Sequence, residues 1–447
     1  MNKHTVLLFV FSTLSLVQTR AQNLYFPPLT GNTWQTLTPA SQNFCAERID
    51  SLYQFLETNS TKGFLLLKDG KIVLEKYFDT FVQDSFWYWA SAGKSLTAFL
   101  VGQAQDAGLV NIQDKTSDYL GVGWTSAPAD KEAKITLWHQ LTMTNGLDDT
   151  FVPTPTDPDP NLCKEPECLN YLADAGTRWA YHTGAYRLLH DVLAEASNAT
   201  IQQYTKSALL DQVGMKGFWF QDVFYSRPRD MARFGLLCLA QGVWNGDTLL
   251  HDQAYFNAMV NTSQTHNKSY GYLWWLNGKQ SFMVPGLQFS FPGKLIPNAP
   301  NDMYAALGKN DQKLHIVPSK GWVVVRLGNV GGFTGPGGDA VPIQFDNAMW
   351  NYLNQLDCNA VATTEPAALN IQISPNPTSD SWLLISDHRI DYLEITDVNG
   401  RLLRSLSNEQ ETAVQIDGRD FKPGVYYARL YGAGNSTTVK LVKSANE

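Results

Sequence analysis

Short strand-like segments at both ends of a long helical region constrain the fold of this chain most strongly. The stretch 63–77 reads as two strands joined by Asp69-Gly70, a dipeptide preferred in two-residue β-hairpin turns. Three more strand-like segments, 303–308, 313–318 and 322–327, follow only after a long stretch of helical periodicity. This order predicts one α+β domain whose sheet begins with the hairpin and is completed by the late strands.

The expected helices follow from apolar periodicity and from capping residues. We expect an amphipathic helix at 40–56, a helix from Ser91 to about Asp106, a helix at 135–147 with Thr136 as N-cap and Gly146 as stop, a helix after the turn at 176–182, one capped by Ser226 with an early Pro228, and a last one at 340–356. The aromatic segment 270–275 is a further predicted strand. The loop 149–168 contains five prolines and is long enough to form a lid or rim.

The composition changes after Cys358, which indicates a second folded unit. Residues 359–369 are rich in Ala and Thr and predict a linker. From residue 370 to 447 the chain alternates short apolar strands with tight turns such as Asn399-Gly400. The sequence therefore predicts a main domain at 22–358 and a small β-sandwich at 370–447.

The N-terminus has the features of a secretory signal. Lys3 and His4 precede an apolar run from Val6 to Val17, which is short for a membrane span, and residues 19–21 fit a cleavage site. We expect residues 1–21 to be removed and the protein to be exported, with no transmembrane segment later in the chain. The formal net charge is −8 and there is no Lys/Arg cluster, so nucleic acid is excluded as an expected partner.

Export makes disulfides possible for the five cysteines. Cys163 and Cys168 lie close together in the proline-rich loop and predict a small clasp. Cys45 and Cys358 lie at the two ends of the main domain and pair if the first and last helices pack together. Cys238, in an apolar segment, is predicted to be a buried free thiol. The alternative that all five cysteines are reduced stays open.

Ser91 is a candidate nucleophile because Lys94 follows it by three residues at the start of a helix. Positions i and i+3 share a helix face, so the hydroxyl and the amine can meet. A serine needs a neighbouring group to take its proton, and the helix start favours negative charge. About one or two Ser-x-x-Lys sequences occur by chance in a chain of this length. A simple surface helix is therefore the alternative unless other segments support catalysis.

Several ordered segments supply that support as a family resemblance. Ser91-Ala-Gly-Lys94, the segment 135–147, Gly176-Thr-Arg-Trp-Ala-Tyr181, the segment 229–235 and the segment 270–275 resemble the serine β-lactamase-related superfamily. This group includes class C β-lactamases, D,D-peptidases, esterases and 6-aminohexanoate-oligomer hydrolases. The resemblance covers roughly 44–356 and implies an antiparallel sheet flanked by helices, with a mostly helical subdomain.

The resemblance implies a role for each matching residue. Ser91 matches the acylated nucleophile and Lys94 the lysine that takes or relays its proton. Tyr181 matches a tyrosine that acts as base in acylation and as acid toward the leaving group; taken alone, without Ser91, it is better explained as a packed aromatic before a helix. A phenol near pKa 10 is a poor base, so an ammonium such as Lys94 must stabilise its phenolate. The implied oxyanion hole uses the backbone N–H of Ser91 and one near Gly308.

Two positions depart from the family pattern. Thr183 stands where an asparagine usually contacts the acyl side of the substrate, and Ala306-Leu307-Gly308 replaces a Lys-Thr-Gly strand motif. The missing lysine normally helps to bind a carboxylate, so its loss favours ester or uncharged amide substrates over β-lactams. Lys309 is a candidate substitute, although strand alternation predicts that it points away. His182 is a candidate substrate contact, with a supporting role as the alternative.

The tail resembles a type IX secretion C-terminal sorting domain. The segments 373–378, 393–403, 424–430 and 438–443 carry this resemblance. It implies a Bacteroidetes-type bacterium, interaction with the type IX secretion machinery, passage across the outer membrane and removal of the tail. A carbohydrate-binding β-sandwich is the alternative.

Together these segments predict a secreted or cell-surface serine hydrolase that forms an acyl-enzyme on Ser91 and acts on small-molecule or peptide-like esters or amides. The alternatives are a true β-lactamase or D,D-carboxypeptidase, and an inactive relative that binds peptidoglycan or penicillins. His315 is predicted to be structural. There is no His-Glu-x-x-His and no Cys/His ligand spacing, so neither a metal nor a cofactor is expected.

Overall fold

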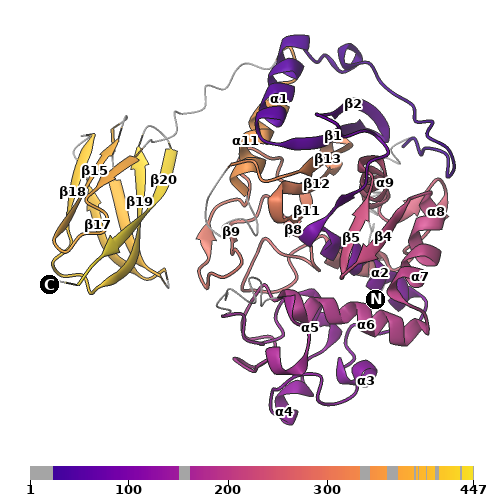
Figure 1. Cartoon of the computed structure of the whole chain (residues 1–447), viewed down its shortest axis with the longest axis horizontal. Helices are drawn as coiled ribbons and strands as arrows, with labels where there is room; N and C mark the ends of the chain where they lie inside the picture. Colours follow the sequence, from indigo (N-terminus) through magenta and orange to yellow (C-terminus); the bar gives the residue numbers. More distant parts are fainter. Residues whose placement is uncertain are drawn as a thin grey trace, which may run out of the picture.

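The computed structural model describes two folded regions joined through residues 360–370 (Figure 1). It describes residues 24–150, 162–332 and 343–359 of the main region. In the tail it describes residues 371–445 except 387–388, 391, 399, 408–411 and 433–434. The predicted signal 1–21 and nearly all of the predicted linker 359–369 lie outside the described residues.

A six-stranded antiparallel sheet forms the centre of the main region. Its order is β2-β1-β13-β12-β11-β8, so the hairpin from the start of the chain pairs with strands from its end, as the sequence predicted. The strands are β1 Thr61–Lys68, β2 Lys71–Tyr77, β8 Trp275–Leu276, β11 Tyr304–Gly308, β12 Gln312–Val317 and β13 Trp322–Gly328. Asp69-Gly70 forms the hairpin turn, with Gly70 at φ +84°.

Helices cover both faces of this sheet. On one face α9 (Pro228–Leu239) packs so closely that a Cβ on Gly235 would lie 2.4 Å from the Val323 side chain. On the other face α1 (Ala46–Thr58) packs against α11 (Ile343–Asn354). Helix α2 (Gly93–Asp106) runs through the core beside β11, and all but two of its residues are buried.

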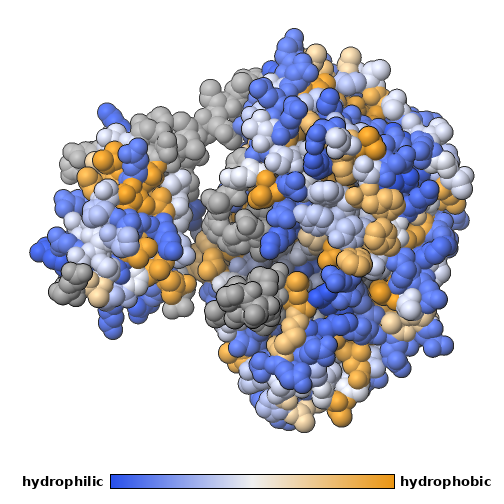
Figure 2. Space-filling model, in the orientation of Figure 1, coloured by the Kyte–Doolittle hydropathy of each residue, from blue (hydrophilic) through white to orange (hydrophobic). Residues whose placement is uncertain are grey.

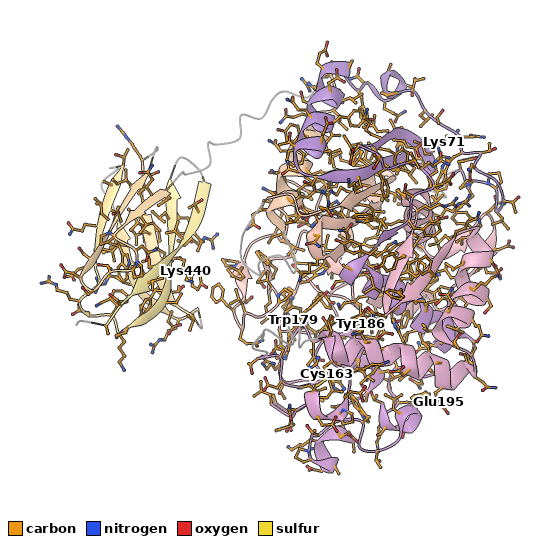
Figure 3. All side chains as sticks on the ribbon, viewed as in Figure 1. Lys71, Cys163, Trp179, Tyr186, Glu195 and Lys440 are labelled. Atoms are coloured by element: carbon orange, nitrogen blue, oxygen red, sulfur yellow. A yellow bond between two sulfur atoms is a disulfide. The ribbon has the colours of Figure 1, made fainter. Side chains whose placement is uncertain are left out.

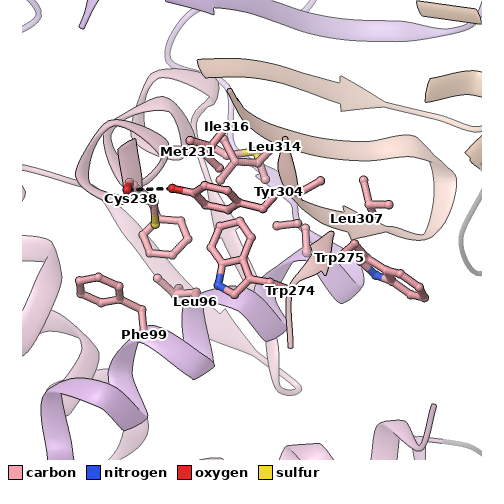
Figure 4. Close-up of a cluster of buried hydrophobic side chains, with 14 of the residues drawn as sticks. Leu96, Phe99, Met231, Cys238, Trp274, Trp275, Tyr304, Leu307, Leu314 and Ile316 are labelled. Atoms are coloured by element: carbon pink, nitrogen blue, oxygen red, sulfur yellow. Dashed lines mark hydrogen bonds between the residues drawn. The ribbon is translucent and has the colours of Figure 1, made fainter. Parts of the chain in front are cut away.

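The core between α2, α9 and the sheet is apolar and rich in aromatic rings (Figure 4). Its one drawn hydrogen bond runs from the Tyr304 hydroxyl to the Cys238 carbonyl at 2.9 Å. Cys238 is a fully buried free thiol, and burial raises its pKa. This packing fixes α2, and with it the segment that carries Ser91, against the edge of the sheet.

The remaining elements of the main region are the long helix α6 and a set of short helices, turns and strands. Figure 1 shows α3, α4, α5 and α6 gathered below the sheet. The helices are α3 Ser117–Leu120, α4 Ala129–Glu132, α5 Leu137–Leu141, α6 Thr183–Ser197, α7 Ile201–Thr205, α8 Asp211–Val213 and α10 Gln253–Met259, with a π-helical turn η5 Lys206–Leu210 between α7 and α8. The 3-10 turns are η1 Pro39–Gln42, η2 Ala90–Ala92, η4 Pro166–Cys168, η6 Lys309–Asp311 and η7 Pro318–Lys320. The short strands are β3 Trp87–Tyr88, β4 Gly217–Phe220, β5 Val223–Ser226, β6 Val243–Trp244, β7 Asp247–Thr248, β9 Ser281–Phe282 and β10 Phe291–Pro292.

Two predicted helices are shorter than expected because a residue in the left-handed region interrupts them. The helix predicted at 40–56 starts only at Ala46, since Asn43 at φ +58° ends the preceding turn η1. The helix predicted at 135–147 ends at Leu141, and Met143 follows at φ +58°. Thr136 does cap it. Gly146 is instead needed because a Cβ there would lie 2.1 Å from the Ala173 carbonyl.

Two further boundaries were predicted wrongly. Ser226 is the last residue of β5, and its hydroxyl accepts a hydrogen bond from Trp89 Nε1 at 2.8 Å; the N-cap of α9 is Arg227. The strand predicted at 270–275 is reduced to β8, since Leu273 adopts φ +57° and turns the chain before it. In both cases a tertiary contact outweighs the local preference, since the Leu273 N–H donates to the Leu141 carbonyl at 3.0 Å.

The tail folds into two facing sheets, which matches the predicted β-sandwich. One has the order β14-β15-β18 and the other β17-β16-β19-β20. The strands are β14 Ile371–Ser374, β15 Ser381–Ser386, β16 Tyr392–Asp397, β17 Leu402–Ser407, β18 Ala413–Asp417, β19 Gly424–Gly432 and β20 Asn435–Lys443. A separate core around the fully buried Trp382 fills the sandwich.

Four cysteines are paired in the structure. Cys45, just before α1, is bonded to Cys358, just after α11, so one disulfide joins the first and last helices of the main region. Cys163 is bonded to Cys168. None of the helices in the described part of the chain combines the length and apolar character needed to cross a bilayer.

Candidate active site

Ser91 lies in the middle of η2, where the chain leaves strand β3 and enters helix α2. Ala90, directly before it, adopts φ +47°, a conformation that costs energy for a residue with a Cβ. The Trp89 N–H donates to the Phe224 carbonyl at 2.8 Å and so ties the segment to β5. Ser91 is partly exposed, whereas Ala92 and Gly93 behind it are buried. A serine on a constrained turn that is partly open to solvent can be reached by a substrate and can act as a nucleophile.

Lys94 points back toward Ser91 from the first turn of α2. Its Nζ lies 2.9 Å from Ser91 Oγ and 3.5 Å from Thr183 Oγ1. The side chain is almost fully buried, and Nζ lies 4.8 Å from the ring centroid of Tyr181 and 4.2 Å from that of Tyr186. The amine therefore sits within hydrogen-bonding distance of the serine, in surroundings made largely of aromatic rings.

Tyr181 reaches the same serine from the segment before α6. Its ring is buried, stacks on Trp275 at 5.8 Å and meets the edge of Tyr270 at 6.3 Å. Burial raises the pKa of Tyr181 well above its ordinary value, and a hydrogen bond with the Ser91 side chain offsets this in part. In the resting site Tyr181 is therefore a neutral phenol, which suits it to donate a proton.

The end of β11 lies against the serine turn. A Cβ on Gly308 would lie 2.3 Å from the Trp89 carbonyl oxygen and 3.1 Å from the Ala92 nitrogen, so only glycine allows this approach. Lys309 follows, is exposed, and begins η6 rather than continuing the strand. Lys309 therefore lies outside the strand, and strand alternation does not set the direction of its side chain.

The two departures from the family pattern take defined places. Ala306 is fully buried in β11. Its methyl group stands at the position where the family motif has a lysine, so residue 306 carries no charge. Thr183 is the first residue of α6, and its hydroxyl accepts from Lys94. Thr183 thus joins the polar contacts of the lysine.

His182 serves as the N-cap of α6. Its Nδ1 accepts a hydrogen bond from the Ala185 N–H at 3.1 Å, and the side chain is fully buried. Burial lowers the pKa of His182 to about 4, and Asp148 opposes this in part. The structure therefore places His182 as a neutral helix cap beside Tyr181.

The disulfide-bonded loop at Cys163 lies against the start of α6. A Cβ on Gly184 would lie 1.9 Å from the Cys163 carbonyl oxygen. Arg187 donates to the Leu162 carbonyl at 2.6 Å and holds the same loop from the helix. Figure 3 shows Cys163, Trp179 and Tyr186 in the same part of the main region. The loop forms one border of the site, while residues 151–161 of the predicted lid lie outside the described residues.

A second cluster of buried polar residues lies behind the sheet. Lys313 forms ion pairs with Asp346 and, at 3.2 Å, with Asp311. His315 Nε2 lies 2.6 Å from Asp346, and its Nδ1 accepts from Trp350 Nε1 at 3.1 Å. Across the parts of the chain that the structure describes, no group of three or more His, Cys, Asp or Glu residues is arranged to hold a metal ion.

The sequence brought Ser91, Lys94, Tyr181 and Thr183 forward, and the structure brings them together. The sequence assigned no site role to Tyr186, or to Tyr270 and Trp275 at the two ends of the resembling segment 270–275, and these residues enclose Lys94 and Tyr181. Tyr186 follows Thr183 by three residues and so shares its helix face, which was the available signal. The resemblance of segment 270–275 pointed to Tyr270 and Trp275 without a role, because their approach to Tyr181 depends on how the chain turns at Leu273.

Comparison with known families gives two matches along the chain. The beta-lactamase family model matches residues 60–342. A model for the secretion system C-terminal sorting domain matches residues 372–444, which include all of the tail strands except the first residue of β14.

Individual relatives are more distant. A Bacillus subtilis (strain 168) protein named as the penicillin-binding protein PbpX is 24% identical over 172 residues, which are 37% of this chain and 42% of the relative. Among solved structures, one named as a 6-aminohexanoate-dimer hydrolase from Bacillus anthracis has a TM-score of 0.54 and 17% identity, covering 72% of this chain and 86% of its own. Another, named as a beta-lactamase from Bacteroides dorei, has a TM-score of 0.55 and 15% identity, covering 70% and 99%. At these identities the structures show a shared fold.

Proposed function

The chain belongs to the beta-lactamase family, and from this premise we propose that it is a secreted serine hydrolase that forms an acyl-enzyme on Ser91. One observation carries the proposal. Ser91 Oγ lies 2.9 Å from Lys94 Nζ and is hydrogen-bonded to Tyr181, so a single hydroxyl faces two groups that exchange protons. This is the arrangement that activates a serine for attack on a carbonyl carbon.

The roles of the three residues follow from their surroundings. Ser91 Oγ attacks the substrate carbonyl while its proton passes to Lys94 Nζ. Because burial keeps Tyr181 protonated, its phenol is assigned as the acid that protonates the departing alcohol or amine. The proton on Lys94 then passes to the Tyr181 phenolate, which restores both groups. Water attacks the acyl carbon and gives a proton to Lys94, and Lys94 returns that proton to Ser91 Oγ as the carboxylic acid leaves.

The carbonyl oxygen becomes negatively charged during attack and needs hydrogen-bond donors. Gly308 brings the end of β11 against the turn that carries Ser91. We assign the oxyanion hole to the backbone N–H of Ser91 and to an N–H at the Gly308–Lys309 end of the strand. Such donors contribute about 10²- to 10³-fold to the rate.

We assign ester or uncharged amide substrates because of residue 306. Ala306 is buried and carries no charge at the position of the family's motif lysine. A β-lactam or a D-Ala-D-Ala peptide carries a carboxylate that a lysine at this position would bind through a charge-assisted hydrogen bond. A β-lactamase or D,D-carboxypeptidase remains the alternative that the substrate test separates.

Labelling with a fluorophosphonate tests the nucleophile. Wild-type protein should be labelled, and Ser91→Ala should not. Ser95→Ala is the matched control: it lies one turn further along α2, is buried and donates to the Leu273 carbonyl at 2.7 Å, so its loss leaves labelling intact. Equal labelling of Ser91→Ala would refute the acyl-enzyme.

Turnover with two substrates tests the chemistry. We expect hydrolysis of a p-nitrophenyl ester and little hydrolysis of a chromogenic cephalosporin. The reverse preference would establish a β-lactamase. Failure to turn over either substrate, with no labelling, would favour a binding protein.

We also propose that the tail directs the protein through a type IX secretion system to the cell surface or beyond and is then removed. The match at 372–444 supports this, and an N-terminal signal at 1–21 would bring the chain to the periplasm first. Deleting residues 370–447 should leave an active enzyme in the periplasm. Unchanged secretion of the truncated protein would contradict the proposal.

A further inference from the structure

The small sheet β3-β5-β4 presents a face made of aromatic rings. Neighbouring residues of a strand point to opposite faces, so Trp89 and Phe224 point into the core while Tyr88, Tyr225 and Phe218 point outward. Tyr88 and Phe218 both lie directly opposite Tyr225. With Phe86 and Phe220 these residues form what we call the outer aromatic face: Phe86, Tyr88, Phe218, Phe220 and Tyr225.

The rings of this face are packed against one another rather than scattered. The rings of Phe218 and Tyr225 are stacked, with centroids 5.3 Å apart and planes within 3°. Tyr225 also contacts Tyr88 at 6.3 Å and Phe220 at 6.4 Å, while Phe86 contacts Phe218 at 5.7 Å. The face is therefore one continuous apolar surface centred on Tyr225.

This surface is open to solvent. Phe220 is 57% exposed, Phe218 42% and Phe86 40%, and every exposed phenylalanine in the described parts of the chain belongs to this face. Figure 2 shows hydrophobic residues where β4 and β5 lie in Figure 1. Contiguous apolar surface of this kind marks a place where something binds.

The outer aromatic face is continuous with the active site at one edge. Strand β3 leads directly into the turn of Ser91, with Tyr88 three residues before the serine. The Tyr88 hydroxyl accepts a hydrogen bond from Asn310 Nδ2 at 2.8 Å, and Asn310 is two residues beyond Gly308. Tyr88 thus joins the face to both segments assigned to the oxyanion hole.

The turn of the β4–β5 hairpin is fixed to α6, the helix that follows Tyr181. Asp222, in the turn between β4 and β5, forms an ion pair with Arg187 of α6 at 2.9 Å. The hairpin that carries Phe218, Phe220 and Tyr225 is therefore held between the serine turn and α6. Three residues span at most about 10 Å, so the outer aromatic face begins within about 10 Å of Ser91. Neighbouring strands are about 4.8 Å apart, so from β3 the face continues across two strand spacings, over β5 and β4.

We propose that the outer aromatic face is a substrate subsite that binds a long alkyl or aryl group of an uncharged ester. The proposal rests on the proposed function and names the class of substrate that fits the same site. Its rings offer apolar contact without a charged side chain among the five residues. Each methylene that leaves water for such a surface gains about 0.8 kcal/mol, or about fourfold in kcat/KM when fully buried.

A chain-length series of p-nitrophenyl esters, from acetate to decanoate, tests the subsite. In the wild type, kcat/KM should rise at least about tenfold from acetate to octanoate. In the Phe218→Ser/Phe220→Ser variant that rise should disappear while acetate turnover stays within twofold. Val122→Ser, at a residue 91% exposed outside this face, is the matched control and should keep the full rise.

The possible failures are separable. If wild type does not hydrolyse even the acetate ester, the proposed function fails. If acetate turnover is normal but the octanoate preference is unchanged in the double variant, the subsite is refuted. If the double variant loses acetate turnover as well, the chain-length profile is measured in Phe220→Ser alone, since Phe220 is the most exposed ring. An unchanged octanoate preference in that single variant would refute the subsite. A wild-type dimer that the double variant makes monomeric, without any change in the chain-length profile, would assign the face to a second copy of the chain and overturn the proposal.

Discussion

The protein buries a lysine and a histidine in two places, and their neighbours differ. Behind the sheet, Lys313 lies between Asp311 and Asp346, and His315 bonds Asp346. At Ser91, Lys94 contacts the hydroxyls of Ser91 and Thr183 and two tyrosine rings. Carboxylates hold a lysine as a fixed cation, whereas hydroxyls exchange protons with it. We therefore expect the same residue types to stabilise the fold in one place and to provide the proposed chemistry in the other.

The two histidines also differ in their hydrogen-bond partners, and both have structural roles. His315 Nδ1 accepts from the indole N–H of Trp350, which can only donate, so its Nε2 carries the proton and donates to Asp346. Although burial opposes it, Lys313 and this hydrogen bond hold the pKa of Asp346 below its ordinary value. His182 instead uses Nδ1 to cap α6 beside Tyr181.

The same substitution at the two lysines gives the sharpest test of this comparison. Lys94→Met should lower kcat for ester hydrolysis on the order of 10³- to 10⁴-fold, because it removes the group proposed to take the Ser91 proton. The unfolding free energy should change little, since the methionine side chain suits the rings around it. Chemical denaturation and steady-state kinetics measure both. A variant with near-normal turnover would contradict the role of Lys94.

Lys313→Met should have the opposite profile. It leaves Asp311 and Asp346 buried without the cation between them, which should cost about 3–5 kcal/mol of unfolding free energy. The fraction that remains folded should keep its kcat, because Lys313 lies behind the sheet. A loss of stability below about 1 kcal/mol would show that the ion pairs are not structural.

The sequence was informative where contacts are local. Ser91 and Lys94 are three residues apart, so helix geometry alone brings them together. The hairpin at Asp69-Gly70 and the late strands follow from alternation and turn chemistry. Family resemblance added Tyr181, whose distance from Ser91 along the chain hides it from any local rule.

The rest depended on contacts between distant segments. Ser226 has good capping chemistry, yet its hydroxyl bonds Trp89 across the small sheet and the helix starts later. Tyr88 and Tyr225 each look like ordinary strand residues, and only their pairing creates the outer aromatic face. The ion pair of Lys313 with Asp346 likewise joins a strand to the last helix. Register and packing set these features, and neither is written in a local pattern.

The histidine at the active-site side predicts a pH dependence of stability. His182 has a pKa of about 4 in the folded protein and about 6.5 when unfolded, so the unfolded chain binds its proton first. The stabilisation is complete above about pH 6.5, falls as the pH drops, and levels off below about pH 4. Its full size is about 3 kcal/mol.

His182→Asn should remove this pH dependence while still capping α6. Wild type and variant should both be measured at pH 6.5 and at pH 4. Between these pH values the loss of unfolding free energy should be smaller in the variant than in wild type, and the difference between the two losses should be up to about 3 kcal/mol. His251→Asn, at an exposed histidine, is the control and should follow wild type. Parallel pH profiles for wild type and His182→Asn would refute the neutral buried state.

Substituting two glycines near Ser91 tests whether the close approach of β11 to the serine turn is needed for turnover. Gly308 lies at that close approach, and Gly93 lies on α2. A Cβ on Gly308 would lie 2.3 Å from the Trp89 carbonyl oxygen, whereas the nearest atom to a Cβ on Gly93 lies at 3.6 Å, an ordinary contact. Gly308→Ala should therefore move the end of β11 away from the serine turn and lower kcat by about 10- to 100-fold, as expected for a displaced oxyanion donor. Gly93→Ala, two residues from Ser91, should keep kcat within about threefold. Equal kinetics for the two variants would mean that the approach of β11 to the serine turn does not build the oxyanion hole.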